Sequence, residues 1–283
     1  MTQVLIVGCG DLGSAVANQL VQLGIKTIGV RRSVDSHSNF KIIQADVTQP
    51  SSLNILREVQ PEILIYCVAA NGQTDTQYKA HYVDGLQNVL ATQDENTQLK
   101  HVFFVSSTRV YGQVTDVLLT ESVDAIPADF GGERLLEGEH LLDSINCNST
   151  VLRLSGIYGE GRLRMINLAE TPDKWPVQNN WSNRIHRDDA AAFIVFLTQQ
   201  VLAVKEIKNC YIVTDSMPVP QHEVLRWLVS QLPIKVQPEN ISHEALPIEG
   251  GKRLSNEEML STGFKLQYPD FKAGYQAILS QCL

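Results

Sequence analysis

The stretch VLIVGCGDLGSAV, residues 4–16, places a glycine-rich turn between a short apolar run and an amphipathic helical pattern. Gly8 permits a tight turn, Gly10 lets a pyrophosphate approach the backbone, and Gly13 lets the helix pack closely against the strand. The amino end of that helix then faces the phosphate charge. The pattern predicts a dinucleotide-binding βαβ unit at the start of the chain. Two further residues of the predicted cofactor loop are Asp11 and Leu12.

The alternation of strand and helix patterns continues beyond the glycine loop. Apolar runs alternate with helical patterns as far as about Gly156, and apolar strands of this kind indicate a parallel sheet covered by helices on both faces. After Gly156, prolines interrupt the pattern and the helical pieces are shorter. We therefore predict an α/β fold with a Rossmann-type, doubly wound parallel sheet over residues 1–156. A smaller C-terminal substrate lobe is expected over 157–283, with part of 183–214 returning to the first domain.

Composition excludes several classes of protein. A hydrophobic content of 43% in 283 residues is ample for a folded core, and a net charge of −8 argues against a nucleic-acid partner. The sequence has no long apolar run and no signal-peptide pattern, so we expect no membrane partner and a cytoplasmic location. Five scattered cysteines indicate reduced thiols, and seven histidines without an i, i+4 pair predict no metal site.

The end of the second predicted strand indicates which dinucleotide is bound. NAD sites usually carry an acidic residue there for the ribose 2′-hydroxyl, whereas this chain has Arg31 and Arg32. One charge-assisted hydrogen bond to a 2′-phosphate contributes roughly 1.5–3 kcal/mol, which favours NADP by about tenfold to a hundredfold. The alternative interpretation is that both arginines are ordinary surface residues.

Several motifs, in order along the chain, resemble the extended and atypical short-chain dehydrogenase/reductase families, the NAD(P)-dependent epimerase/dehydratase-like group. They cover nearly the whole sequence, and their joint order is more specific than any one of them. The resemblance implies a small-molecule substrate and dimerisation through helices. The matching segments are GCGDLG (8–13), ADVT (45–48), VAA (68–70), VFFVSSTRVYG (102–112), VLRLSGIYGEGR (151–162), RIHRDDAA (184–191) and GKRLSNEEMLSTGFKLQYP (251–269).

The resemblance also implies roles for individual residues. Asp46 and Val47 would flank the adenine, and Ser107 would hold a substrate hydroxyl. His186, in RIHRDDAA, is interpreted as structural rather than as an acid or base. The residues expected along the cofactor are Val68, Ala69 and Ala70.

The proton relay of the family is absent from its usual place. The family carries YxxxK on the helix after the serine strand, and the corresponding positions here are Phe130 and Arg134. Phenylalanine has no proton to transfer; arginine can hold ribose hydroxyls but stays protonated. A positioned general acid or base typically contributes about 10²–10⁴-fold, so the usual mechanism cannot operate unchanged. The literal YPDFK at 268–272 lies in the C-terminal motif and is interpreted as coincidence.

Four residues are candidates for a substitute acid, and the sequence does not choose among them: Tyr82, Asp84, Tyr111 and Tyr158. Each tyrosine could equally be an aromatic filling the space between lobes, and the aspartate could face solvent. Sugar-nucleotide dehydratases resembling this family place an acidic pair where this chain has Thr108 and Arg109, so that elimination chemistry is not expected.

Two functions remain open from the sequence. The first is an NADP(H)-dependent oxidoreductase or epimerase acting on a small hydroxylated or carbonyl substrate, sugar derivatives included. In it Ser107 holds the substrate and Arg134 the ribose, while Tyr158 or water supplies the proton. The second is a catalytically impaired, NADP(H)-responsive binding or regulatory protein, in which Phe130 packs against the nicotinamide and Arg134 clamps the cofactor.

Overall fold

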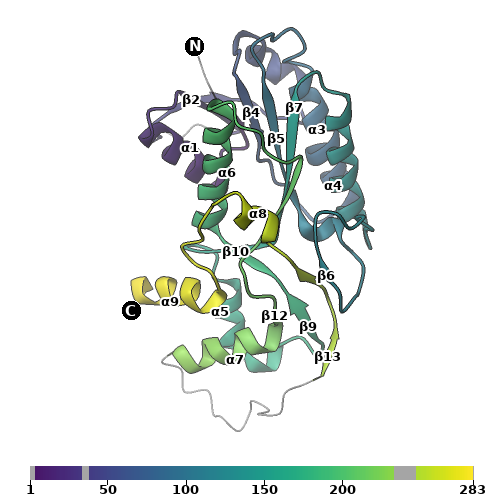
Figure 1. Ribbon diagram of the computed structural model, residues 1–283, viewed down its shortest axis with the longest axis vertical. Helices are drawn as coiled ribbons and strands as arrows, with labels where there is room; N and C mark the ends of the chain where they lie inside the picture. Colours follow the sequence, from purple (N-terminus) through teal and green to yellow (C-terminus); the bar gives the residue numbers. More distant parts are fainter. Residues whose placement is uncertain (1–3, 34–37, 233–246, 283) are drawn as a thin grey trace. The chain divides into compact units, whose positions relative to one another are not determined.

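The computed structural model of the protein describes residues 4–33, 38–232 and 247–282. At its centre is a seven-stranded sheet in the order β11-β7-β5-β4-β1-β2-β3 (Figure 1). β1 pairs in parallel with β2 and β4, and the pairs β2–β3 and β4–β5 are also parallel. The predicted Rossmann-type α/β fold is therefore confirmed. The strands are β1 (Val4–Val7), β2 (Thr27–Arg31), β3 (Lys41–Gln44), β4 (Ile63–Tyr66), β5 (His101–Ser107), β7 (Asn148–Leu154) and β11 (Cys210–Val213).

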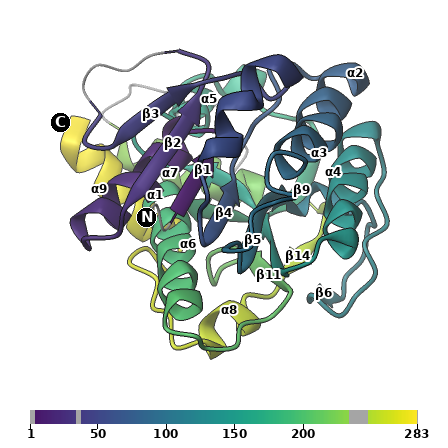
Figure 2. The same ribbon diagram turned by 90° about the horizontal axis from the view of Figure 1, so that it is seen from above.

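Helices cover both faces of this sheet (Figures 1 and 2). One face carries α1 (Asp11–Gln22) and α6 (Arg187–Leu202); the other carries η1 (Pro50–Glu58), α3 (Gly85–Leu90) and α4 (Phe130–Leu141). Successive strand residues point to opposite faces, and both faces are covered, so the central strands β1 and β4 are apolar and buried at every position. Under η1 and α3 the core is formed by a fully buried set that includes Leu5, Leu64, Tyr66, Val102, Phe104, Leu53, Leu56, Leu86 and Val89.

The strand order reverses between β1 and β4. In open α/β sheets a ligand binds at the carboxyl ends of the strands, where the order reverses. The loops that follow these two strands lie against each other, because the Cys67 amide donates to the Val7 carbonyl (2.7 Å). The glycine loop of residues 8–13 and the segment 67–70 therefore meet at the position where such folds bind a dinucleotide.

The helical segment after β4 is interrupted. It consists of α2 (Asp75–Tyr78), a π-helical turn η2 (Lys79–Asp84) and α3. The buried Tyr66 hydroxyl, at the end of β4, donates a hydrogen bond to the His81 carbonyl in η2. This bond ties the π-helical turn to the sheet. π-Turns within helices are frequent at functional sites. The sequence pattern does not reveal this π-turn, because the turn depends on Tyr66, which lies 15 residues before His81.

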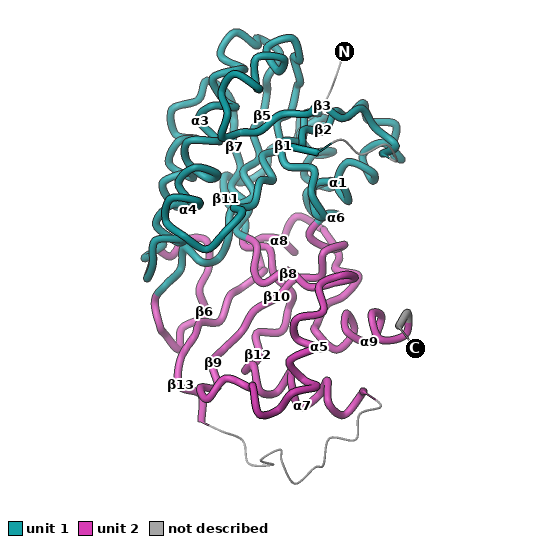
Figure 3. The backbone as a smooth tube through the Cα atoms, turned by 180° about the vertical axis from the view of Figure 1, so that it is seen from behind, with its two compact units in different colours: residues 1–112, 124–153, 191–211 teal, residues 113–123, 154–190, 212–283 magenta. Residues whose placement is uncertain are grey.

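The chain divides into two compact units (Figure 3). Unit 1 takes residues up to 112, 124–153 and 191–211; unit 2 takes 113–123, 154–190 and 212 onwards. The domain boundary predicted at residue 156 places 113–123 in the first domain. These residues join unit 2 because β6 (Leu118–Leu119) pairs with β14 (Arg253–Leu254), more than 130 positions later in the chain.

The remaining elements belong to both units. Those of unit 1 are η3 (Thr108–Val110) and η4 (Leu142–Ser144). Those of unit 2 are β8 (Gly156–Tyr158), α5 (Arg164–Ala169), η5 (Pro172–Lys174), β9 (Asn179–Ser182), β10 (Arg184–His186), β12 (Val219–Pro220), α7 (Gln221–Gln231), β13 (Ile248–Gly250), α8 (Glu257–Ser261) and α9 (Phe271–Cys282).

Candidate functional site: a dinucleotide loop and an arginine cluster

The three glycines of the loop have different surroundings. Gly8 has φ +99°, and a Cβ there would lie 2.4 Å from the Cys67 carbonyl oxygen. A Cβ on Gly13 would lie 2.3 Å from the Gly8 carbonyl oxygen, whereas a Cβ on Gly10 would have no described atom within 4 Å. The first and third glycines therefore serve the packing of the protein itself. The second leaves open space at the amino end of α1, which fits an approaching pyrophosphate.

The residues expected around the adenine are fixed by hydrogen bonds. Asp46 accepts bonds from the Thr48 amide and hydroxyl (2.9 and 2.8 Å). Burial raises the pKa of Asp46, but these hydrogen bonds together with the nearby Arg32 and His81 lower that pKa below its ordinary value. Asn88 of α3 donates to the Val47 carbonyl (2.9 Å). The Ala70 amide donates to the Tyr82 hydroxyl (3.4 Å), so η2 and α3 support both predicted cofactor segments.

A small cavity of about 100 Å³ lies beside the end of β2. Arg31 is half-buried there, and Arg32 beside it is exposed. A cavity of this size equals the volume of about three water molecules at about 30 Å³ each, and a phosphate group fits it. The lining residues are Ser14, Asn18, Arg31, Ser38, Asn39, Phe40 and Ile42.

Arg109 is the centre of a side-chain cluster in unit 1, which we call the Arg109 cluster: Gln73, Tyr78, Arg109, Asp129 and Phe130. The guanidinium contacts both carboxylate oxygens of Asp129 through Nε and Nη2 (2.9–3.1 Å). Its Nη1 donates to the Gln73 amide oxygen (3.0 Å) and to the Tyr78 hydroxyl (2.8 Å). The guanidinium carbon lies 5.0 Å from the Tyr78 ring centroid and 5.3 Å from that of Phe130, within cation–π range.

The two glycines that follow Phe130 make room for this arginine. A Cβ on Gly131 would lie 2.4 Å from the Arg109 guanidinium carbon, and a Cβ on Gly132 would lie 2.6 Å from the Arg109 carbonyl oxygen. Asp129 caps α4 by accepting from the amides of both glycines (2.9 and 3.0 Å). The sequence reasoning missed Gln73 and Tyr78 and used Arg109 only to exclude dehydration. The paired glycines after an N-cap aspartate were the available signal.

The two residues at the family's YxxxK positions take other partners. Phe130 begins α4 and contacts the Tyr78 ring edge-on, with centroids 5.5 Å apart. Arg134 pairs with Asp75 through Nε (2.7 Å) and with Glu137 through Nη1 (2.7 Å). A ribose contact for Arg134 thus competes with two carboxylates, and it stays a prediction.

The other candidates in unit 1 differ in their surroundings. Ser107 ends β5 and is half-buried, and its hydroxyl accepts from the Arg109 amide (3.2 Å). Asp84 ends η2 and pairs with Lys79 (2.6 Å). Tyr111 is fully buried, and its hydroxyl accepts from Arg153 (2.6 Å). Arg153 also pairs with the buried Glu139 (2.6 Å), so Tyr111 is part of a closed structural network.

Tyr158 belongs to unit 2 and is buried in its core. Its ring packs on Tyr275 with centroids 4.5 Å apart and leaves no room for a Cβ on Gly274. Its hydroxyl donates to the Asp270 carbonyl (3.4 Å), and burial raises its pKa well above the ordinary value. Nothing in these contacts favours an acid role. His186 stacks on Tyr268 at 4.0 Å and is likewise surrounded by aromatic rings.

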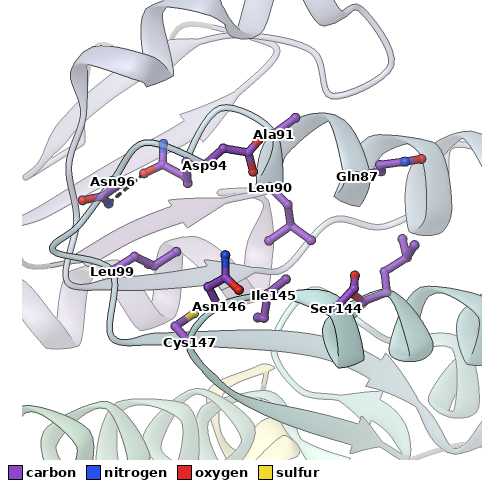
Figure 4. A pocket seen from close by; sticks show the side chains of 12 residues that line it. Gln87, Leu90, Ala91, Asp94, Asn96, Leu99, Ser144, Ile145, Asn146 and Cys147 are labelled. Atoms are coloured by element: carbon purple, nitrogen blue, oxygen red, sulfur yellow. Dashed lines mark hydrogen bonds between the residues drawn. The ribbon is translucent and has the colours of Figure 1, made fainter.

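A larger cavity of about 320 Å³ opens elsewhere in unit 1 (Figure 4). Its lining residues include Leu90, Asp94, Leu99, Ile145 and Cys147. They precede β5 and β7, so the cavity lies at the amino ends of those strands, at the edge opposite the glycine loop. Within the described parts of the chain, no three His, Cys, Asp or Glu side chains are placed to hold a metal ion. No helix in those parts combines the length and apolar character needed to cross a bilayer.

Comparison with known proteins agrees with this geometry. All of residues 1–283 match the family described as the RmlD substrate binding domain. A structure from Methylobacillus flagellatus, named provisionally as an NAD-dependent epimerase/dehydratase, is 44% identical, with a TM-score of 0.87 over 99% of this chain and 98% of that one.

More distant structures share the fold. WbmH of Bordetella bronchiseptica, in complex with NAD+, is 17% identical with a TM-score of 0.76 over 97% of this chain and 96% of that one. The dTDP-glucose 4,6-dehydratase of Bacillus anthracis, in complex with NAD, is 17% identical with a TM-score of 0.78, covering 98% and 94% of the two chains.

A curated relative from Haloferax volcanii is named "Probable low-salt glycan biosynthesis reductase Agl14". It is 26% identical over 155 residues, which are 53% of this chain and 51% of the relative, so the match spans about half of each protein. The resemblance to the epimerase/dehydratase-like short-chain dehydrogenases is confirmed by the whole-chain match and by the 44% identical structure. The chain belongs to the RmlD substrate-binding-domain family.

Proposed function

We propose that the protein is an NADP(H)-dependent oxidoreductase or epimerase that acts on a hydroxyl or carbonyl group of a sugar-derived substrate. The observation that carries the proposal is the contrast among the three loop glycines. Gly8 and Gly13 are closed by backbone oxygens, and Gly10 opens on free space at the amino end of α1. That arrangement suits a dinucleotide pyrophosphate. The half-buried Arg31 beside a phosphate-sized cavity supports the 2′-phosphorylated cofactor.

The names of the relatives support the substrate class. WbmG of Bordetella bronchiseptica, 17% identical, was solved with NAD and UDP, and the Haloferax relative is named as a reductase of glycan biosynthesis. A nucleotide-linked sugar is therefore the first substrate class to test. Dehydration is disfavoured because Arg109 occupies a position where the dehydratases resembling this family carry an acid. The Arg109 side chain forms an ion pair with Asp129 instead.

Each residue of the proposed site has a separate role in binding or in the reaction. A bound nicotinamide supplies or accepts a hydride. Ser107, at the carboxyl end of β5, holds the reacting oxygen, while the Asp46–Val47 segment receives the adenine. Arg31 and Arg32 bind the 2′-phosphate and thereby select the cofactor.

The cofactor assignment predicts a measurable preference. Titration calorimetry with NADPH, NADP+, NADH and NAD+ should give at least tenfold tighter binding of the phosphorylated pair. Arg31→Ala with Arg32→Ala should remove that preference and leave NADH affinity unchanged, because NADH carries no 2′-phosphate. Arg57→Ala, an exposed arginine of η1, controls for the loss of positive charge. Equal affinity of the wild type for NADH and NADPH would refute the assignment, and absence of binding to all four would refute the proposed function.

A further inference from the structure

We propose that Tyr78 is the group that transfers the proton in this protein, with Arg109 beside it in the place of the family's lysine. The inference rests on the proposed function and names the residue that replaces the missing relay. It is carried by the Arg109 cluster, in which a phenol and a fixed guanidinium meet beside the position where the family has its tyrosine.

The position of Tyr78 is the first argument. Its ring contacts Phe130 edge-on at 5.5 Å, so its phenol lies next to the residue that stands in the family's tyrosine position. On the same helical segment its ring contacts Tyr82 at 5.2 Å. Tyr82 in turn accepts from the amide of Ala70, in the predicted cofactor segment after β4. Tyr78 thus lies between the predicted cofactor segment and the head of α4.

The hydrogen bonds of the phenol are the second argument. Arg109 can only donate, so the Tyr78 oxygen accepts from Nη1 at 2.8 Å and directs its own proton to the Gln73 amide oxygen at 3.1 Å. Arg109 is fixed by two bonds to Asp129 and stays protonated. Gln73 is exposed, so a substrate oxygen can replace it as the acceptor. The Tyr78 phenol therefore accepts from the permanently charged Arg109 and donates to the Gln73 amide oxygen, which a substrate oxygen can replace.

The chemical step balances with these groups. In the reductive direction a hydride from the reduced nicotinamide adds to the substrate carbonyl carbon, and the Tyr78 proton moves to the carbonyl oxygen. The products are an alcohol, an oxidised nicotinamide and a phenolate whose negative charge faces Arg109. A proton from solvent then restores the phenol. In the oxidative direction the phenolate takes the alcohol proton as the hydride leaves.

The other tyrosines of unit 1 are less suited to this role. Tyr78 is itself 7% exposed, so burial does not separate the candidates. The half-buried Tyr82 has its hydroxyl engaged by the Ala70 amide, and burial raises its pKa above the ordinary value. Tyr111 also faces an arginine, but that pair is closed by Glu139, and Tyr111 is fully buried. Tyr78 differs from both in having an exposed residue as the acceptor of its proton.

The test compares variants in which one tyrosine hydroxyl group is removed or is moved to a neighbouring position. Four proteins are assayed with NADPH and a panel of small aldehydes, and with NADP+ and a panel of UDP- and dTDP-linked hexoses, by absorbance at 340 nm. They are the wild type, Tyr78→Phe, Tyr78→Phe with Phe130→Tyr, and Tyr211→Phe. Tyr211 is a buried tyrosine of β11 whose hydroxyl accepts from the Lys208 amide, so it controls for loss of a structural hydroxyl. NADPH affinity is measured for all four.

We expect Tyr78→Phe to lower kcat about 100-fold with unchanged NADPH affinity, as removal of a general acid does. Tyr211→Phe should keep the wild-type rate. Phe130→Tyr in the Tyr78→Phe background should restore part of the activity, since it places a phenol at the adjacent position. This rescue is not expected if Tyr78 is only structural.

Three results would overturn the inference. The first is a wild-type rate in Tyr78→Phe. The second is a wild type that binds NADPH and turns over no compound of the panels. The third is a loss in Tyr78→Phe that comes with lost NADPH affinity and is not rescued by Phe130→Tyr. Failure of the wild type to bind any dinucleotide is a different result, because it removes the proposed function itself.

Discussion

Gly10→Ala is expected to leave the protein folded and to weaken NADPH binding more than 100-fold, equivalent to about 2.7 kcal/mol. Gly10 has a negative φ of −80°, outside the left-handed range that favours glycine, and its Cβ would meet no described atom within 4 Å. The added methyl group would instead occupy the space through which a pyrophosphate reaches the backbone amides. Calorimetric titration with NADPH and urea unfolding, performed on the same preparation, measure the two effects separately.

Gly13→Ala is the matched control, because it makes the same chemical change three residues later. Its Cβ would meet the Gly8 carbonyl oxygen at 2.3 Å, so helix α1 has to move away from the loop. We expect a loss of about 1–3 kcal/mol in the free energy of unfolding, as for other overpacked sites. If Gly10→Ala binds NADPH as tightly as the wild type, the open space beside it is not a pyrophosphate site.

Asp215→Asn is expected to stabilise the protein at pH 8 relative to the wild type and to have little effect near pH 4. Asp215 is 1% exposed. Its Oδ1 accepts from the Met217 amide, and Oδ2 has no hydrogen-bond partner among the described residues. Burial raises its pKa to about 7, and Asp270 and Asp189 add to this, while Arg184 acts in the opposite direction. An ionised carboxylate in this position is costly because burial removes its hydration.

The direction of the pH dependence follows from proton binding. In the window from about pH 4 to about pH 7 the folded protein holds a proton that the unfolded chain has released, so the free energy of unfolding falls as pH rises. A displacement of about three pKa units corresponds to roughly 4 kcal/mol, an upper limit because Arg184 loses a favourable neighbour in the variant. Urea unfolding at pH 5 and pH 8 measures the difference. Asp173→Asn, an exposed position of unit 2, controls for the removed charge, and parallel pH profiles of Asp215→Asn and wild type would contradict the prediction.

The fold and the glycine loop could be predicted because their signals are local. Continuous apolar runs define β1 and β4, and the spacing of Gly8, Gly10 and Gly13 defines the turn between β1 and α1. The Arg109 cluster could not be predicted in the same way. Arg109 contacts Tyr78, 31 positions away in the sequence, and Gln73, 36 positions away. The periodic pattern of apolar residues does not predict contacts between such distant polar residues.

Two other differences have the same physical origin. The π-turn at Lys79–Asp84 depends on the Tyr66 hydroxyl of another element, so the pattern of residues 75–92 predicts one uninterrupted helix. Tyr158 was a candidate acid because it lies in a family motif, but the motif does not show that Gly274 and Tyr275 close over its ring. Sequence patterns predict which face of an element is buried, but they do not predict which polar atoms remain free after burial.

The glycine pair at the head of α4 also constrains the order in which substitutions can build this site. A side chain at position 131 would displace the Arg109 guanidinium from Asp129, and one at 132 would press on the Arg109 backbone. A chain with larger residues at both positions cannot hold Arg109 in this arrangement, so both glycines have to be present before the arginine pairs with Asp129 as it does here. Return to a tyrosine-and-lysine arrangement by Phe130→Tyr and Arg134→Lys leaves the arginine in place. Any series of substitutions that leads to this arrangement therefore has a preferred order, and glycine comes first.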